Sequence, residues 1–417
     1  MTSHFDEFET RDPDKREADL FLALPTFIAE ATENAPGLRD WLSGCDPAAL
    51  IDRTALAALP VLRKPELMEL QAADPPFGGL ANPDALIGNH VFMSPGPVWE
   101  PQGFGADPWQ SARALFAAGF RPGDILHNSF SYHMTPGAFV LDEGARALGC
   151  LVFPAGVGNT DAQVDAAATL KPSAFAGTPD YLKVLLDKAA ESGVDLSSIK
   201  RAMVSGGALF PLLREEYKSR GVHVLQSYAT ADIGIIAYES SDEDGNPHPG
   251  MILNENLIVE IVRPGTGDPV QDGEVGEIVV TSLNRAYPLI RFGTGDMTAV
   301  LEGSSPCGRT GIRIKGWMGR ADQRTKVKGM FVDPKQIAAI VERHTDVAKA
   351  RLRVYRDRDQ DAMTLQVEPV GNAVLDADAL ASTLADVTKL KGAVEPVAAG
   401  SLPNDGKVIA DDRDYEQ

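Results

Sequence analysis

The sequence is poor in positive charge. Its 39 Lys and Arg residues stand against 59 Asp and Glu residues, which gives a formal net charge of -20 and an isoelectric point near 4.8. The summed electric field of such a chain repels phosphate-rich surfaces. The composition therefore argues against a nucleic-acid partner and against an anionic membrane, although a basic pocket can still form locally.

Cysteines and long apolar runs are scarce as well. Cys45, Cys150 and Cys307 are odd in number and far apart, so the sequence indicates neither a disulfide framework nor a thiolate metal cluster. Asp, Glu, Pro and Gly interrupt every apolar stretch before it is long enough to cross a bilayer, and no secretory leader opens the chain. We expect a cytoplasmic protein without a membrane partner.

The chain does contain enough apolar material for two or three domains. Its 417 residues are 44% hydrophobic and 24% charged, as in ordinary globular enzymes. Up to about Leu80 the sequence is acidic and then helical in pattern, with Ala-Leu-Pro and Val-Leu-Arg-Lys-Pro segments that are expected to end helices quickly. We interpret this first part as a packing cap.

Between residues 107 and 226, short apolar runs alternate with amphipathic helical stretches. The predicted strands are 125–127, 150–154, 173–177, 202–205 and 222–225. The predicted helices include 110–118, 161–170 and 181–191. This alternation predicts an α/β fold, with a large N-terminal domain in which a parallel sheet is wrapped by helices.

After Met251 the pattern changes to alternating strands, predicted at 257–262, 277–283 and 289–292. We expect a small β subdomain at about residues 251–318, within a large domain of residues 1–319. Residues 320–417 are expected to form a small, mobile α+β domain behind a linker at 319–323. Its predicted elements are a β pattern at 324–332, a helix at 334–343, strands at 350–355 and 363–367, and a helix at 377–387.

Three polar segments follow predicted strands of the parallel sheet. They are Gly177-Thr178-Pro179, Ser205-Gly206-Gly207-Ala208 and Ser227-Tyr228-Ala229-Thr230. Ligands of such sheets bind at the carboxyl ends of the strands. We therefore expect the three segments to converge on one crevice.

Two charged loops with glycines lie close together in the second half of the chain. The first runs from Arg291 to Asp296 as Arg-Phe-Gly-Thr-Gly-Asp, and the second is Gly319-Arg320-Ala321-Asp322. A carboxylate in the first loop can accept both hydroxyls of a ribose, and the guanidinium of the second suits anionic groups. Either loop alone is equally well an ordinary turn. Together they indicate a nucleotide site beside a hinge.

The order of these motifs resembles the phenylacetate-coenzyme A ligases, within the adenylate-forming superfamily of acyl-coenzyme A synthetases, adenylation domains and luciferases. The resemblance spans roughly residue 89 to the C-terminus, and residues 276–334 carry its most specific part. The motifs are Ser205-Gly206-Gly207-Ala208, Tyr228-Ala229-Thr230-Ala231-Asp232, Gly276-Glu277-Ile278-Val279-Val280-Thr281, Tyr287 to Asp296, Gly319 to Asp322, and Ser401-Leu402-Pro403-Asn404-Asp405-Gly406-Lys407.

The resemblance implies ATP-dependent activation of a carboxylic acid. The acid attacks the α-phosphate of ATP to give an acyl-adenylate, and the thiol of coenzyme A then displaces AMP. In such enzymes the C-terminal domain swings between the two steps. Asp296 matches the ribose carboxylate, and Arg320 matches an arginine that reaches the nucleotide. The adenine pocket is matched by Ser205, Gly206, Gly207, Ala208 and Tyr228, with Ala229 and Thr230 beside it.

Three further residues acquire roles from the resemblance. Asp232 stands where a glutamate usually binds Mg²⁺, a hard cation that prefers oxygen ligands. Asp322 matches the hinge of the C-terminal domain. Lys407 matches the catalytic lysine that bridges the attacking carboxylate and the phosphate, where an ammonium stabilises the redistributed charge. The alternative for Lys407 is a solvated lysine in a mobile tail.

The largest departure lies where these enzymes carry a Ser/Thr/Gly-rich phosphate loop that ends in lysine. The corresponding residues here run from Ser94 to Pro101 as Ser-Pro-Gly-Pro-Val-Trp-Glu-Pro. Three prolines remove backbone donors, and Glu100 stands where a cation is expected. An acid beside polyphosphate costs on the order of one to several kcal/mol unless magnesium or a basic neighbour intervenes. The sequence therefore predicts weak binding of ATP.

The remaining candidate residues belong to an expected acyl pocket and to an incomplete zinc site. The acyl pocket is expected along residues 130–138 and includes Tyr132, His133, Met134 and Gly137, whose aromatic and thioether groups suit a planar or short apolar acid. His133 is either a ligand-orienting group or a core residue. Cys307 and His248 resemble half of the four-ligand zinc site of some relatives, so we predict no zinc.

The leading hypothesis is an acid-thiol ligase that makes an acyl- or aryl-coenzyme A from a small acid, with an aromatic acid favoured. Two alternatives stay open. One is a non-catalytic or regulatory nucleotide binder, supported by the Pro-rich segment with Glu100. The other is an adenylate-forming enzyme that passes the acyl group to a carrier protein or an amine. A homodimer is implied by the resemblance alone.

Overall fold

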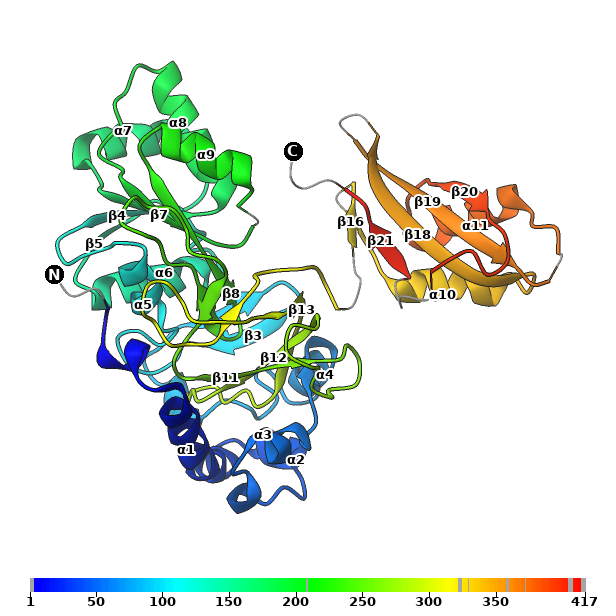
Figure 1. The fold of residues 1–417 in the computed structure, drawn as a ribbon, viewed down its shortest axis with the longest axis horizontal. Helices are drawn as coiled ribbons and strands as arrows, with labels where there is room; N and C mark the ends of the chain where they lie inside the picture. The colour runs from blue at the N-terminus through cyan, green and yellow to red at the C-terminus, as the bar shows by residue number, and fades with distance from the viewer. Residues whose placement is uncertain are drawn as a thin grey trace. The chain divides into compact units, whose positions relative to one another are not determined.

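The structure, a computed structural model, describes residues 4–207, 209–321, 325–328, 330–357, 360–371, 373–403 and 408–413. It divides into two compact units, Met1–Met318 and Gly319–Gln417 (Figure 1). The larger unit contains a nine-stranded sheet, a four-stranded sheet and a hairpin, and the smaller unit contains a second four-stranded sheet. The predicted α/β class is confirmed.

The chain of the larger unit begins with helices, drawn in blue in Figure 1. They are α1 (Pro13–Asn34), α2 (Pro36–Trp41), α3 (Arg53–Ala57) and α4 (Lys64–Ala73), with short 3-10 turns at Glu7–Thr10, Pro47–Ala49 and Pro83–Leu86. The prediction that Ala-Leu-Pro ends helices quickly is wrong for α1, which continues through Pro25. Leu24 and Ile28, one turn apart, are fully buried and hold the helix together across the missing hydrogen bond.

The nine-stranded sheet has the order β14-β15-β10-β9-β8-β7-β6-β4-β5. The five strands from β5 to β8 are parallel, and the others pair antiparallel. Their bounds are β4 Ile125–Asn128, β5 Leu151–Pro154, β6 Ala174–Gly177, β7 Arg201–Val204, β8 His223–Thr230, β9 Gly234–Tyr238, β10 Met251–Leu253, β14 Val300–Leu301 and β15 Arg313–Ile314. The predicted parallel strands are thereby confirmed.

Helices cover both faces of the parallel part. One face packs on α5 (Ser111–Ala117) and α6 (Gly137–Ala147), and the other on α7 (Thr160–Leu170), α8 (Pro179–Glu191) and α9 (Pro211–Ser219). Along β6, Ala174 and Ala176 belong to the first core cluster, whereas Phe175 belongs to the second. This alternation follows from the two-residue period of a strand.

The second sheet of the larger unit has the order β1-β13-β12-β11. Its strands are β1 Leu62–Arg63, β11 Leu257–Val262, β12 Gly276–Ser282 and β13 Phe292–Thr298. A separate hairpin joins β2 (Val91–Ser94) to β3 (Val98–Pro101). Residues 251–318 thus contribute to two sheets, because β10, β14 and β15 pair within the nine-stranded sheet.

The predicted strand at 289–292 is wrong. Leu289 and Ile290 are fully buried but lie outside any strand, and β13 begins at Phe292 and runs through the expected Gly-Thr-Gly-Asp loop. Arg291 adopts a φ of 49°, and its buried guanidinium donates to Glu260 at 2.9 and 3.0 Å. The turn at Arg291 interrupts the extended backbone, and the buried ion pair fixes it there.

The smaller unit has α+β architecture, drawn from yellow to red in Figure 1. Its elements are β16 Thr325–Val327, β17 Met330–Val332, α10 Pro334–Arg343, β18 Val347–Asp357, β19 Gln360–Pro369, α11 Ala377–Thr388, β20 Ala393–Pro396 and β21 Ile409–Asp411. The sheet order is β20-β19-β18-β21. Helix α10 has the predicted bounds, because Asp333 and Gln336 form a capping box and Pro334 occupies the first helical position.

Candidate functional site

Two of the predicted nucleotide-binding residues meet between the two sheets of the larger unit. The Tyr228 hydroxyl on β8 donates to Asp296 Oδ2 on β13 at 2.8 Å. The indole Nε1 of Trp317 donates to the other carboxylate oxygen, Oδ1, at 3.0 Å. Asp296 is half-buried, and its backbone N–H donates to Thr294 Oγ1 at 3.1 Å. Each carboxylate oxygen therefore accepts a hydrogen bond from the protein, and each carries a second lone pair that can accept from another donor.

The predicted adenine segment lies after β7 and is tied to the neighbouring strand β8. Ser205 is buried and donates from Oγ to the Ser227 carbonyl at 2.9 Å. The Gln226 side chain donates to the Gly207 carbonyl at 2.8 Å, and Gly206 adopts a φ of 72° that glycine tolerates. These contacts place the segment beside the strand of Tyr228. Ala208 lies outside the described residues.

The prediction that Ser227, Tyr228, Ala229 and Thr230 follow a strand is wrong, because all four lie within β8. Strand β9 pairs with them antiparallel and extends β8 beyond the end expected from sequence. Thr230 Oγ1 accepts from the Ile233 backbone N–H at 3.2 Å. The threonine thus shapes the turn that carries Asp232.

Asp232 lies in this turn with its side chain fully buried, and its Oδ2 is 3.2 Å from Lys64 Nζ. Neither of its carboxylate oxygens accepts a hydrogen bond from the described residues. Lys64 is the first residue of α4, in the part of the chain interpreted from sequence as a packing cap. The N-terminal region therefore reaches the predicted magnesium position.

The segment corresponding to the phosphate loop is the β2–β3 hairpin. Glu100 is 2% exposed, and Ser94 Oγ donates to its Oε1 at 2.5 Å. Burial raises the pKa of Glu100 to about 8, and the negative charge of Asp232 acts in the same direction. The Glu100 side chain therefore points into the protein, close to Asp232.

The expected acyl segment leads into α6. The Tyr132 hydroxyl donates to Asp142 Oδ2 at 2.7 Å and accepts from Asn128 Nδ2 at 2.9 Å, so it positions the segment. His133 and Met134 are exposed, and Gly137 is the first residue of α6. The alternative that His133 is a core residue is therefore wrong.

The remaining predicted residues belong to the smaller unit. Arg320 is half-buried. Asp322, the predicted hinge, and Lys407, the predicted catalytic lysine, lie outside the described residues. Their roles stay predictions.

His248 and Cys307, which resemble half of a zinc site, lie in a polar cluster around Ser240. Its hydroxyl lies 3.1 Å from His248 Nδ1 and donates to Cys307 Sγ at 3.3 Å. Burial raises the pKa of the Cys307 thiol, but hydrogen bonds from Ser240, Ser305 and Arg309 outweigh burial and lower this pKa below its ordinary value. Within the described ranges no three His, Cys, Asp or Glu side chains gather as metal ligands, and the absence of zinc stays a prediction.

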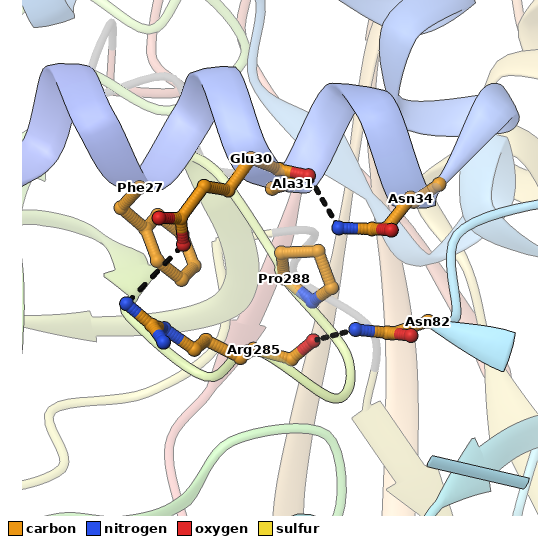
Figure 2. Close-up of a pocket in the computed structure, with 8 residues that line it drawn as sticks. Phe27, Glu30, Ala31, Asn34, Asn82, Arg285 and Pro288 are labelled. Atoms are coloured by element: carbon orange, nitrogen blue, oxygen red, sulfur yellow. Dashed lines mark hydrogen bonds and ion pairs between the residues drawn. The ribbon is translucent and has the colours of Figure 1, made fainter. Parts of the chain in front are cut away.

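A small cavity of about 140 Å³ opens elsewhere, between α1 and the segment before β13 (Figure 2). Arg285 spans it with an ion pair to Glu30 at 3.2 Å, as the dashed line in Figure 2 marks. Its lining residues are Phe27, Glu30, Ala31, Asn34, Ala35, Asn82, Arg285 and Pro288. None of the predicted site residues lines it. Among the described helices, none has the length and hydropathy that a membrane span requires.

Sequence reasoning missed two residues of this site, Lys64 and Trp317. Lys64 directly follows β1, and Trp317 stands two residues before the second charged loop. The one available signal for Trp317 was an exposed aromatic residue next to a predicted linker. No local pattern connects Lys64 with Asp232, because their contact depends on the fold.

Comparisons with known proteins identify the family of the chain. The family described as AMP-binding enzyme matches residues 131–286, a range that contains Ser205, Tyr228 and Asp232. The α/β fold and this family match together define an AMP-binding enzyme. The phenylacetate-coenzyme A ligase of Thermus thermophilus is 30% identical over 378 residues, which are 87% of this chain and 83% of that protein. The chain belongs to the phenylacetate-coenzyme A ligase family.

Two further relatives extend the comparison. The phenylacetate-coenzyme A ligase of Aromatoleum evansii is 28% identical, over 82% of this chain and 79% of that protein. The solved structure of a 2-hydroxyisobutyryl-CoA ligase, in complex with 2-HIB-AMP and CoA in the thioesterification state, aligns with a TM-score of 0.74 and 26% identity. That alignment covers 99% of this chain and 93% of the other. Another structure of the same ligase represents a postadenylation state.

Proposed function

We propose that the protein is an ATP-dependent, AMP-forming acid-thiol ligase that converts a small carboxylic acid into its coenzyme A thioester. The observation that carries this proposal is the contact between Tyr228 and Asp296, 2.8 Å apart, in a chain of the phenylacetate-coenzyme A ligase family. A carboxylate held at both oxygens by aligned donors is prepared to accept the two hydroxyls of a ribose.

The nucleotide occupies the crevice between β8 and β13 in this proposal. Asp296 binds the ribose, and the adenine ring lies between Tyr228 and the segment Ser205, Gly206, Gly207 and Ala208. Ala229 and Thr230 lie beside the α-phosphate at the end of β8. Arg320 supplies a guanidinium that reaches the nucleotide. The support is the burial of Ser205 and its bond to the Ser227 carbonyl, which fix the segment beside Tyr228.

Mg²⁺ fits at Asp232. The carboxylate is buried and accepts no hydrogen bond from the described residues, which leaves oxygen lone pairs for a hard cation. When bound there, the ion neutralises phosphate charge and makes pyrophosphate a better leaving group. The shorter side chain of aspartate, compared with the usual glutamate, gives the ion fewer positions along the phosphate chain.

The reaction has two half-reactions. A carboxylate oxygen of the acid attacks the α-phosphorus of ATP, the bond to pyrophosphate breaks, and an acyl-adenylate forms. The thiol sulfur of coenzyme A then attacks the acyl carbon, AMP leaves with the bonding electron pair, and the thiol proton passes to solvent. Lys407 stabilises the charge on the attacking carboxylate and the α-phosphate in the first half-reaction.

The smaller unit serves the two half-reactions in turn. In our proposal residues 1–319 form the domain that binds nucleotide and acyl group, and residues 320–417 swing about Asp322 to bring Lys407 in or out. The solved structures of the 2-hydroxyisobutyryl-CoA ligase support this scheme, because they represent a thioesterification state and a postadenylation state.

The acid is small, and an aromatic acid fits best. Tyr132 packs edge to face on Phe139 with ring centroids 5.4 Å apart, and Met134 and His133 add adaptable and polar surface, while Gly137 leaves space. The names of the relatives specify phenylacetate, whereas the name of the structural neighbour specifies a small hydroxy acid. We also propose that the protein forms a homodimer and binds neither nucleic acid nor a membrane.

A second candidate function is supported by one observation. The Pro-rich hairpin carries buried Glu100 next to Asp232, so the described phosphate end contains two acids. Two acids at this position do not impair a protein that binds a nucleotide but does not cleave its phosphates. Transfer of the acyl group to a carrier protein or an amine is the alternative to coenzyme A.

The test is pyrophosphate release from Mg-ATP over a panel of aryl and short aliphatic acids, with and without coenzyme A. A ligase shows turnover that depends on both an acid and coenzyme A, with an acyl-coenzyme A product in the mass spectrum. Release of pyrophosphate without any thiol, with accumulation of adenylate, favours a different acceptor. No release over the whole panel contradicts the proposal and favours the binder.

A further inference from the structure

A cluster of three charged groups lies where the larger unit is expected to meet the phosphates. It contains Lys64 from α4, Glu100 from β3 and Asp232 from the β8–β9 turn. Lys64 Nζ is 3.2 Å from Asp232 Oδ2, and Glu100 lies within electrostatic range of both other groups. The two acids are at least nine-tenths buried, and Glu100 Oε2 and both Asp232 oxygens accept no hydrogen bond from the described residues. Burial of Glu100 Oε2 and Asp232 Oδ1 without a donor or an ion-pair partner among the described residues indicates that the cluster can accept a further positive group.

The short strand β1 positions Lys64 in this cluster. Strand β1 pairs in parallel with β13, and its residue Arg63 lies opposite Gly293. Arg63 is anchored by an ion pair of 2.9 Å with buried Glu277, so the backbone around it is fixed. Lys64 is the next residue, so the chain turns into α4 beside Gly293, three residues before Asp296 in β13.

The charge balance requires a cation at this place. Polyphosphate brings several negative charges to two buried acids, and Pro95, Pro97 and Pro101 provide no backbone N–H groups for it. The lysine that ends the usual phosphate loop is replaced by Glu100. The Lys64 side chain is 35% exposed, so it is not enclosed by the protein while its ammonium is paired with Asp232.

We propose that Lys64 binds the β- and γ-phosphates of ATP and takes the place of the lysine that the Pro-rich hairpin lacks. This inference rests on the proposed function and adds a phosphate-binding residue to it. Before ATP binds, Lys64 neutralises Asp232. Asp232 would hold Mg²⁺ of bound Mg-ATP through its carboxylate oxygens, and the ammonium of Lys64 would then pair with phosphate oxygens.

The competing interpretation is a structural role, in which Lys64 only neutralises Asp232. The two roles differ in which ligand they affect. A phosphate-binding lysine distinguishes ligands that carry β- and γ-phosphates from ligands that lack them. A structural lysine affects adenosine, AMP and ATP alike, because it acts through the shape of the whole site.

The experiment compares Lys64→Met and Lys64→Arg with the wild type by calorimetric titration of adenosine, AMP and Mg-ATP, without acid or coenzyme A. We expect Lys64→Met to weaken Mg-ATP binding at least tenfold and AMP binding less than threefold, and Lys64→Arg to recover most of the Mg-ATP affinity. Lys188→Met is the control, because Lys188 pairs with Asp161 on the exposed side of α8. Equal losses for AMP and Mg-ATP, or no loss for either, overturn the proposal.

A second variant tests the same cluster without substitution of Lys64. Glu100→Gln removes an acid whose pKa is raised by burial to about 8, so at pH 9 it should tighten Mg-ATP binding by the otherwise wild-type protein at least threefold and leave AMP affinity unchanged. A loss of Mg-ATP affinity in Glu100→Gln contradicts the proposal. A wild type that binds Mg-ATP but forms no thioester refutes the ligase and not the role of Lys64, whereas a wild type that does not bind Mg-ATP refutes both.

Discussion

The two ends of the proposed nucleotide site are built in different ways. At the ribose end, Tyr228 and Trp317 donate to the two oxygens of Asp296, so the carboxylate is held in position by hydrogen bonds. At the phosphate end, Glu100 and Asp232 are buried acids, and Glu100 Oε2 and both Asp232 oxygens accept no hydrogen bond from the described residues. Asp296 is held by two neutral donors, whereas the charge of Asp232 is balanced by the ammonium of Lys64, 3.2 Å from its Oδ2.

This difference separates binding of the ribose from binding of the phosphates. Satisfied polar groups hold a fixed geometry, whereas buried acids without donors raise the free energy of the site until a positive group enters. In our proposal the base and the sugar are recognised by groups already in position, whereas binding of polyphosphate depends on Mg²⁺ and Lys64. Substitutions at the two ends should therefore affect different ligands.

The largest effect is expected for Lys407→Ala. Loss of an ammonium that stabilises developing charge should slow adenylate formation roughly 100- to 1,000-fold. Thioester formation from supplied acyl-adenylate should change far less, because that half-reaction does not use the lysine. Single-turnover assays of the two half-reactions measure both rates. Equal losses in both half-reactions would show that the role of Lys407 is misassigned.

Asp296→Asn tests the ribose end. It removes a charged acceptor of two hydroxyl donors, so adenosine, AMP and Mg-ATP should all bind about 10- to 100-fold more weakly. Titration calorimetry of the three ligands measures this, with Asp272→Asn at an exposed position as the control. A loss confined to Mg-ATP would contradict the assignment, since Asp296 would then act at the phosphates.

Trp317→Phe tests whether the indole occupies the place of a ribose hydroxyl. The wild-type nucleotide must displace the 3.0 Å hydrogen bond from Trp317 Nε1, so its removal should tighten binding of adenosine and AMP about two- to tenfold. The same displacement should change Trp317 fluorescence in the wild type. Weaker binding in the variant would indicate that the indole contacts the nucleotide directly.

His127 provides a titrating group that belongs to neither end. Burial lowers its pKa, and its Nε2 lies 2.8 Å from Gln163 Oε1. The unfolded chain therefore binds a proton more readily, and the free energy of unfolding should fall as the pH drops below about 6.5, by at most about 1.4 kcal/mol per pH unit. Urea unfolding of the wild type and His127→Asn at pH 5.5, 6.5 and 7.5 tests this. Parallel pH profiles for both proteins would contradict it, and bound AMP should leave the difference unchanged.

Asp296 and Tyr228 could be selected from sequence because their signals are local, although the end of the strand that carries Tyr228 was predicted too early. Asp296 follows two glycines and a threonine, and Tyr228 comes three residues after the predicted strand 222–225. Helix α10 was predicted with its observed bounds for the same reason, since Asp333, Pro334 and Gln336 mark its start within four residues.

The phosphate end could not be predicted in the same way. The approach of Lys64 to Asp232 depends on the pairing of β1 with β13, which no local pattern encodes. The false strand at 289–292 has a similar origin, because the turn at Arg291 is fixed by the distant acid Glu260. Likewise, α1 continues through Pro25 because its neighbours are buried against the rest of the unit. Tertiary contacts overrode local propensity in each case.

The most direct test of the account is a crystal structure of the protein with Mg²⁺ and a non-hydrolysable ATP analogue. We expect both ribose hydroxyls within hydrogen-bond distance of Asp296, the metal ion on Asp232, and Lys64 Nζ within about 3 Å of a β- or γ-phosphate oxygen. A nucleotide bound with its ribose on Asp296 but its phosphates turned away from Lys64 and Asp232 would contradict the two-ended site proposed here.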